Sequence, residues 1–290
     1  MVGAMTMNPL ISAEDALGLV GRENVLFLDA SYHLPNAGRD PDKEYLEKRI
    51  PGALRYDINT IADPTAEQPH TMPTAPVFQR HMRALGIRND HTLIVYDNTP
   101  FYSSARAWYM LRYFGHGDVR VLDGGLKAWT KAGGPVDHGS VTPSLEPSQF
   151  ISSEPQGNDG VMMLGGMKRL VDIPAGQRKK QIVDARSRGR FAGTEEEPRP
   201  GLASGHMPGA INIPIGSLIV RETGHIKTVA ELEEIFSVLD ASKPIVTTCG
   251  SGVTACGLAL GLAIIGRQDV AIYDGSWSEW GSRADCPVEQ

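Results

Sequence analysis

The sequence predicts an α/β protein made of two tandem domains, each a small parallel sheet flanked by helices. Three observations lead to this fold class: an internal repeat, an alternation of short apolar runs with helical patterns, and a proline-rich segment between the halves. The chain has 290 residues, which is enough for two domains of ordinary size, each with its own core.

The repeat consists of short motifs that occur twice in the same order, about 150 residues apart. The first copy contains Asp29-Ala30, Ile50 to Ala53, Thr92 to Tyr96 and Asp123 to Trp129, and the second contains Asp184-Ala185, Met207 to Ala210, Pro244 to Thr248 and Asp274 to Trp280. Chance explains several ordered matches poorly. Because solenoid repeats are only about 20 to 50 residues long, this longer period indicates a duplicated domain.

Strands are predicted where short, largely β-branched apolar runs occur, such as Val25–Asp29 and Ile245–Thr248. Helices are predicted at Pro76 to Leu85, Ala105 to Phe114, Val229 to Leu239 and Val253 to Ile265. Strands that alternate with helices imply βαβ units, and therefore a parallel sheet in each half.

A segment between the halves has the composition of a linker. Residues 133–160 contain Pro135, Pro143, Pro147 and Pro155, together with several glycines and serines. We therefore expect a first domain at residues 8–138, a linker at 139–160 and a second domain at 161–288.

The composition excludes several classes of function. Hydrophobic residues make up 41% of the chain and charged residues 21%, as in ordinary globular proteins. The formal net charge of -6 is not that of a nucleic-acid-binding protein, which presents a basic surface. The most apolar stretch, Val253 to Ile265, is shorter than the roughly 18 residues of a membrane span.

The cysteines indicate a reducing environment. Cys249, Cys256 and Cys286 have neither the even count of a disulfide framework nor the CxxC spacing of a zinc site. The N-terminal segment, Met1 to Pro9, lacks the basic start and apolar core of a secretory signal. The cytoplasm is the expected location.

One cysteine lies where α/β proteins place their ligands. Cys249 follows the predicted strand Ile245–Thr248 and precedes Gly250, Ser251 and Gly252, after which a helix is expected to begin. In open α/β sheets, ligands bind in the crevice at the carboxyl ends of the strands. Backbone N–H groups of the loop and the helix dipole both favour a thiolate there. The glycines allow the backbone to curl tightly.

The alternative for Cys249 is a buried structural cysteine, because free cysteines are commonly buried. The repeat argues against it, since Cys249 occupies the strand end that Asp97 occupies in the first half. This is the pattern of a duplicated domain that keeps one active site. We expect Cys256, inside the following helix, to pack in the core and Cys286 to have no role.

The repeat, the two Asp-Gly-x-x-x-x-Trp elements and the cysteine loop together resemble the rhodanese superfamily. The resemblance covers the chain from about Leu26 to Val288 and implies two rhodanese-like domains, of which only the second is catalytic. The loop Cys-Gly-Ser-Gly-Val-Thr is similar to that of the 3-mercaptopyruvate sulfurtransferases. Relatives that use thiosulfate typically carry basic side chains at the positions of Gly250 and Ser251.

The resemblance also implies a reaction. The Cys249 thiolate attacks the sulfur of 3-mercaptopyruvate, pyruvate leaves, and Cys249 becomes a persulfide. A thiol acceptor such as thioredoxin, or cyanide, then removes the outer sulfur, so neither a metal nor an organic cofactor is needed. Gly250, Gly252, Val253 and Thr254 are expected to contact the substrate as parts of the loop.

The carboxylate of the donor requires a cation, and the family has two arginines after its second Asp-Ala-Arg motif. By motif position these are Arg190, which precedes Phe191, and Arg199, in Glu-Pro-Arg. The planar guanidinium suits this role because it pairs with a carboxylate through two hydrogen bonds. The alternative is that the arginines form a solvated face. Arg186 is expected to make a structural ion pair within its own domain.

The family further has a serine two residues after the cysteine, with a histidine and an acidic residue from the first domain. The serine is Ser251, and the histidine aligns with His70; together they can move the proton released in sulfur transfer. The acidic position falls on Asn59, with Asp57 nearby but out of register. An asparagine can orient a histidine but cannot stabilise an imidazolium. His206 is expected to be structural.

Three alternative functions follow from the same residues. The nearest is a thiosulfate sulfurtransferase with the same mechanism, which the uncharged loop disfavours. A cysteine phosphatase on a related fold needs an arginine six residues after the cysteine, where this chain has Ala255. A non-catalytic interaction protein fits the first half, with Asp97 in place of the nucleophile, but not the second, whose loop is intact.

Overall fold

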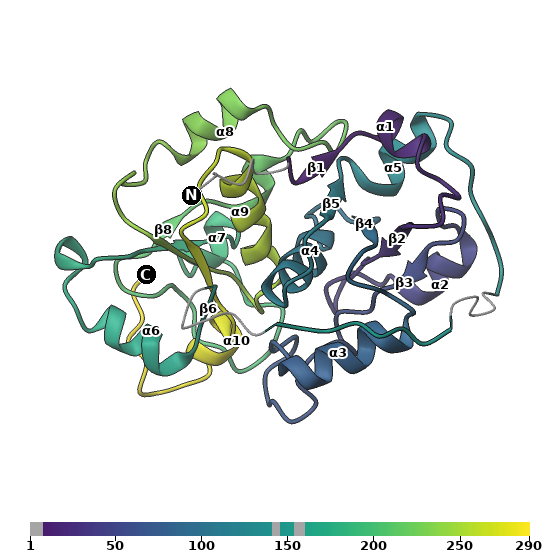
Figure 1. The fold of residues 1–290 in the computed structure, drawn as a ribbon. Helices are drawn as coiled ribbons and strands as arrows, with labels where there is room; N and C mark the ends of the chain where they lie inside the picture. Colours follow the sequence, from purple (N-terminus) through teal and green to yellow (C-terminus); the bar gives the residue numbers. More distant parts are fainter. Residues whose placement is uncertain (1–7, 141–145, 154–159) are drawn as a thin grey trace, which may run out of the picture.

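The computed structural model describes residues 8–140, 146–153 and 160–290, and it contains two parallel sheets flanked by helices (Figure 1). The first sheet has the strand order β1-β5-β4-β2-β3. Its strands are β1 (Leu10–Ile11), β2 (Val25–Asp29), β3 (Leu54–Arg55), β4 (Thr92–Tyr96) and β5 (Val119–Leu122). The helices of this half are α1 (Ala13–Leu17), α2 (Pro41–Glu47), α3 (Ala75–Ala84), α4 (Ser104–Tyr113) and α5 (Gly125–Lys131).

The second sheet repeats this topology with the order β6-β10-β9-β7-β8. Its strands are β6 (Val161–Met162), β7 (Gln181–Asp184), β8 (Ile211–Asn212), β9 (Ile245–Thr248) and β10 (Val270–Tyr273). The helices are α6 (Leu164–Val171), α7 (Arg188–Phe191), α8 (Val229–Phe236), α9 (Val253–Ile264) and α10 (Ser276–Trp280), with the 3-10 turns η1 (Ala175–Gln177) and η2 (Ile215–Leu218). The predicted fold class, a tandem α/β protein with one parallel sheet in each half, is confirmed.

Three of the four predicted helices agree with the structure to within one residue at each end, and the fourth prediction was too long. Helix α8 ends at Phe236, whereas the apolar pattern continues to Leu239. The side chain of Ser237 bonds to the carbonyl of Glu234, and the chain then turns. Leu239 nevertheless stays in the core, because this turn keeps its side chain on the buried face.

One hydrophobic cluster spans both halves, and each half has a further cluster of its own. Helices α4 and α9 lie side by side between the two sheets, and buried side chains from both halves form one continuous cluster around them (Figure 1). Helix α9 is apolar on all sides, as expected for a helix buried on every face. A Cβ on Gly257 would lie 2.5 Å from the Ile215 side chain, so this glycine lets η2 approach α9 closely. Among the described helices, none is long and apolar enough to cross a membrane.

Part of the expected linker is anchored to the first half. Of residues 139–160, positions 141–145 and 154–159 lie outside the described part of the chain. In the described part, Phe150 is fully buried and packs against Phe78, and the backbone of Ser148 bonds to that of Arg83. The proline-rich composition predicted a connecting segment, and the described part of it is held against the first half by Phe150 and by hydrogen bonds.

Candidate active site

Cys249 lies at the carboxyl end of β9, between that strand and α9, as predicted. Its side chain is buried, with 2% of the residue exposed. Its N–H donates to Ser276 Oγ at 3.2 Å, and its carbonyl accepts the N–H of Trp277 at 2.9 Å. Both partners belong to the second Asp-Gly-x-x-x-x-Trp element, which therefore holds the cysteine in place.

The loop after Cys249 turns its carbonyls toward α10. The Gly250 carbonyl accepts bonds from both the N–H and the hydroxyl of Ser278, at 2.8 and 2.7 Å. In a planar trans peptide the N–H points opposite to the carbonyl, so the N–H groups of Gly250 and Ser251 point away from α10. The first-turn N–H groups of α9, including those of Val253 and Thr254, have no partner within the helix. The loop therefore offers several neutral donors to an anionic sulfur.

Gly252 is required by both conformation and space. It has a φ of +82° and forms the N-cap of α9. A Cβ there would lie 3.1 Å from the backbone oxygen of Asp274 and 3.3 Å from Nη1 of Arg106. Any side chain at this position would strain the backbone and push the loop away from the domain junction.

His70 and Ser251 meet across the two halves, as the sequence predicted. His70 Nδ1 lies 3.1 Å from Ser251 Oγ, and His70 Nε2 lies 2.9 Å from Asn59 Oδ1. The amide of Asn59 also donates through Nδ2 to Asp57 Oδ1 at 3.1 Å, which fixes its orientation. Asn59 Oδ1 must then accept a proton from Nε2, so the network assigns the proton to Nε2 and leaves Nδ1 free to accept from Ser251.

The electrostatic surroundings keep His70 neutral. Burial, followed by the charges of Arg106 and Arg199, lowers the pKa of His70 to about 3. A histidine with this pKa does not hold a proton at neutral pH. The expectation that Asn59 cannot stabilise an imidazolium therefore fits a site in which the imidazole stays uncharged.

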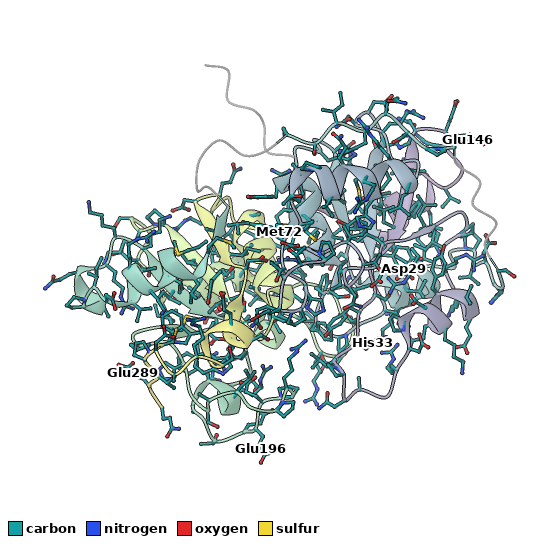
Figure 2. All side chains as sticks on the ribbon, turned by 90° about the horizontal axis from the view of Figure 1, so that it is seen from below. Asp29, His33, Met72, Glu146, Glu196 and Glu289 are labelled. Carbon is teal, nitrogen blue, oxygen red and sulfur yellow. The ribbon has the colours of Figure 1, made fainter. Side chains whose placement is uncertain are left out.

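A buried ion pair holds the segment that carries His70. Arg106 Nη2 donates to Asp274 Oδ1 at 2.9 Å and also to the backbone carbonyl of His70. Asp274 Oδ2 accepts the N–H of Met72 at 2.6 Å, and Met72 lies where the two halves meet (Figure 2). The side chains of Arg106 and Asp274 are essentially inaccessible to solvent, with 0% and 1% exposed. The pair thus fixes His70, whose φ is +61°, against the cysteine loop.

Arg190 lies against the cysteine loop and is held by Glu197. Its Nε and Nη2 both donate to Glu197 Oε2, at 3.1 and 2.5 Å, while Arg186 donates to Oε1 at 2.7 Å. A Cβ on Gly250 would lie only 2.9 Å from Arg190 Nη2. Because Gly250 has no side chain, the Arg190 guanidinium can lie close to the cysteine loop.

Arg199, from the second half, contacts an aromatic pair of the first half. Its Nη2 donates to Tyr32 Oη at 3.4 Å, and the ring of Tyr32 meets that of His70 edge-on, with centroids 4.7 Å apart. Tyr32 is buried, and burial raises the pKa of its phenol. Arg199, Tyr32 and His70 thus form one wall near the cysteine.

Three side chains expected to be structural have structural contacts. Arg186 pairs with Asp184 at 2.7 Å inside its own half. His206 stacks on Phe191 with centroids 3.8 Å apart. Cys256 is fully buried in α9, and burial raises the pKa of its thiol to about 12.

Four residues at the site were missed by reasoning from sequence: Tyr32, Arg106, Glu197 and Asp274. Asp274 and Glu197 belonged to quoted motifs, so their spacing could have drawn attention to them. Tyr32 follows the first Asp-Ala motif closely, and nothing in the local pattern distinguished Arg106 from other helical arginines. In the described ranges, no group of three or more His, Cys, Asp and Glu residues could hold a metal.

Comparison with known proteins agrees with this architecture. The model of the rhodanese-like domain matches residues 12–132 and 168–283. The chain is 41% identical to the 3-mercaptopyruvate sulfurtransferase of Rattus norvegicus over 261 residues, covering 89% of this chain and 85% of the rat protein. It is 40% identical to the thiosulfate sulfurtransferase of Gallus gallus over 261 residues, covering 89% and 86%.

A solved structure shows the same fold over nearly the whole chain. The crystal structure of SseA from Escherichia coli, a 3-mercaptopyruvate sulfotransferase, superimposes with a TM-score of 0.82 at 34% identity and covers 94% of this chain and all of SseA. Since the domain model matches both halves and the relatives extend over most of the length, this chain belongs to the rhodanese family.

Proposed function

We propose that this protein is a 3-mercaptopyruvate sulfurtransferase, in which Cys249 carries the sulfur as a persulfide to a thiol or cyanide acceptor. Residues 161–288 form the catalytic domain, residues 8–138 a non-catalytic domain that contributes His70, and residues 139–160 the linker. The observation that carries the proposal is the combination of an uncharged loop with Arg190 placed against Gly250. Such a site binds a donor whose reacting sulfur is a thiol and whose charge lies on a separate carboxylate.

In the first half-reaction, the Cys249 thiolate attacks the donor sulfur and the carbon–sulfur bond breaks. The electron pair of that bond goes to the methylene carbon, which leaves as the enolate of pyruvate. The thiol proton of the donor is the proton that this carbon finally takes up. Ser251 can pass it, because its hydroxyl donates to the free Nδ1 of His70 and its oxygen can accept at the same time.

The low pKa of His70 defines its part in this transfer. With a pKa of about 3, the imidazole does not store a proton as an imidazolium. We propose that His70 orients the Ser251 hydroxyl and polarises it during a concerted transfer. Asn59 and Asp57 support this role by fixing the tautomer of His70.

Arg190 and Arg199 are the proposed ligands of the donor carboxylate, since a guanidinium pairs well with a carboxylate. Arg190 approaches Gly250 of the loop, and Arg199 lies beside Tyr32 and acts on His70 through its charge. The backbone donors from Gly250 to Thr254 stabilise the anionic persulfide. In the second half-reaction, an acceptor such as thioredoxin or cyanide attacks the outer sulfur and restores the Cys249 thiolate. All three cysteines are free thiols, which suits our proposal of a reducing compartment such as the cytoplasm.

Thiosulfate is the second candidate donor, because a relative that is 40% identical bears that name. A dianionic donor gains from basic side chains in the loop, and a basic side chain at position 250 would collide with Arg190. We therefore expect thiosulfate to be the poorer donor.

The test is the kinetics of sulfur transfer to one acceptor with the two donors side by side. We expect kcat/KM for 3-mercaptopyruvate to exceed that for thiosulfate by at least about tenfold, since one lost charge-assisted contact has this effect. A preference for thiosulfate would overturn the donor assignment. Cys256→Ser, which changes a thiol in the core, serves as the matched control for Cys249→Ser.

A further inference from the structure

The domain junction contains a second arrangement that resembles the active site. Asp274 accepts the N–H of Met72 from the other half at 2.6 Å. Asp123, its counterpart in the first half, accepts the N–H of Ile226 from the other half at 2.8 Å. Met72 and Ile226 therefore correspond, and so do the residues two positions earlier, His70 and Gly224. Both of these have a positive φ, +61° and +83°.

Hydrogen bonds to the backbone extend the correspondence. The carbonyl of His70 accepts a bond from Arg106, which also binds Asp274. Tyr102 Oη lies 2.9 Å from the carbonyl oxygen of Gly224 and 2.7 Å from Asp123 Oδ1, so its single proton is shared between these two acceptors. The second arrangement thus repeats the scaffold of the active site but has a glycine where the active site has its histidine ring.

Asp97 lies at the strand end of the first half that corresponds to Cys249 in the second half. Its carboxylate accepts hydrogen bonds from its own loop. Oδ1 accepts the N–H and the hydroxyl of Thr99, each at 3.1 Å, and Oδ2 accepts the N–H of Ser104 at 2.7 Å. Burial raises the pKa of Asp97. Both oxygens of its carboxylate nevertheless accept hydrogen bonds from its own loop and the first residue of α4.

The space beside Asp97 is a cavity of about 550 Å³ that both halves line. Three cationic side chains line it: Arg39, Lys127 and Arg221. Arg39 is neutralised by Glu44, to which it donates at 2.6 and 2.7 Å. Lys127 and Arg221 form no ion pair with any described residue.

The two cations without an ion-pair partner come from different halves and line the same cavity. Lys127 Nζ donates to the backbone carbonyl of Glu222, the residue after Arg221, at 2.8 Å. An ammonium is a compact point charge, whereas a guanidinium offers a planar pair of donors. Together they suit an anion with several oxygens and more than one negative charge.

We propose that this cavity binds a small dianionic oxyanion of the phosphate or sulfate type, held between Lys127 and Arg221. The site is separate from Cys249 and does not depend on the proposed sulfur transfer. Because its ligands come from both halves, the bound anion stabilises the domain junction and raises the melting temperature by mass action.

The experiment is calorimetric titration of the full chain with inorganic phosphate and, separately, with sulfate, at an ionic strength held constant with chloride. We expect saturable binding of one anion per chain. Lys127→Gln and Arg221→Gln should each weaken it by roughly tenfold, as expected for a lost charge-assisted hydrogen bond, and the double variant should abolish it.

Two controls separate this site from others. Lys131 is exposed and lies one turn further along α5, outside the cavity lining, so Lys131→Gln should leave the affinity unchanged. Arg190→Ala, which alters the proposed donor site, should leave it unchanged as well. The proposal fails if neither anion binds saturably, if binding survives the double variant, or if Arg190→Ala abolishes it.

Discussion

The arrangement around Cys249 and the corresponding arrangement around Asp97 share a scaffold but differ in a few side chains. Each has a strand end, a loop and a motif aspartate that accepts an N–H from the other half. In the first arrangement these elements present Cys249 and His70, and in the second they present Asp97 and Gly224. The comparison teaches that the two arrangements share a backbone scaffold and differ in the side chains that it presents. In our proposal the chemistry depends on those side chains.

The loops also differ in length, and this affects what each can hold. Three residues separate Cys249 from the start of α9, whereas six separate Asp97 from the start of α4. The longer loop folds back so that its N–H groups bond to Asp97. The shorter loop has no such carboxylate, and its N–H groups remain available to a sulfur anion.

The largest expected effect comes from removing the nucleophile. Cys249→Ser should lower kcat for sulfur transfer by at least about four orders of magnitude, since a covalent mechanism loses its reacting atom. Cys256→Ser should keep most of the activity. Steady-state kinetics and the rate of iodoacetamide labelling measure both. Equal, slow labelling of all the cysteines would contradict an activated thiol at Cys249.

The next effect tests the two motif aspartates against each other. Asp274→Asn leaves Arg106 as a buried charge without its partner and should cost about 3 to 5 kcal/mol in the free energy of unfolding. Asp123→Asn keeps an amide oxygen that can accept from Ile226 and Tyr102, and it weakens a partly exposed pair with His225, so it should cost about 1 kcal/mol or less. Denaturant titration measures both variants. Equal losses of unfolding free energy in the two variants would show that the Arg106–Asp274 pair does not stabilise the domain junction more than Asp123 does.

The third prediction concerns the proposed donor site. Arg190→Ala should raise KM for 3-mercaptopyruvate by roughly 10- to 100-fold, because two charge-assisted hydrogen bonds to the carboxylate are lost. The unfolding transition should shift less than in Asp274→Asn, since Glu197 keeps Arg186 as its partner when Arg190 is removed. Arg188→Ala, in the same short helix, is the matched control. An unchanged KM in Arg190→Ala would remove this residue from the site.

The smallest effect is a pH dependence of stability that comes from His70. Gly224, which corresponds to His70 in the arrangement around Asp97, has no group that titrates. The pKa of His70 is lowered from 6.5 to about 3, so between these values the unfolded chain binds a proton that the folded chain does not. Stability therefore falls as the pH falls, and between pH 6.5 and 5 this loss is on the order of 2 kcal/mol. His70→Gln should reduce the slope of unfolding free energy against pH. A slope identical to that of the wild type would argue against a neutral buried His70.

Much of the site was predictable because its signals are local. A strand, a cysteine, a glycine-rich turn and a helix follow one another within about 20 residues, so their order alone put Cys249 at a strand end. The motif positions likewise identified Arg190, Arg199, Ser251 and His70 as candidates. The alignment of Asn59 with an acidic position was also visible, but its bond to Asp57, and hence the tautomer of His70, was not.

The sequence by itself determined the duplicated α/β fold and the position of Cys249 at a strand end of the second half, because periodicity, turn residues and repeated motifs depend on neighbours along the chain. Only the tertiary structure decided that Tyr32 contacts Arg199, that Arg106 pairs with Asp274, and that Lys127 and Arg221 line one cavity beside Asp97. These partners are separated by more than 90 positions in the chain. They meet only because packing of α4 against α9 buries the apolar faces of both halves, and such contacts leave no periodic signal in the sequence.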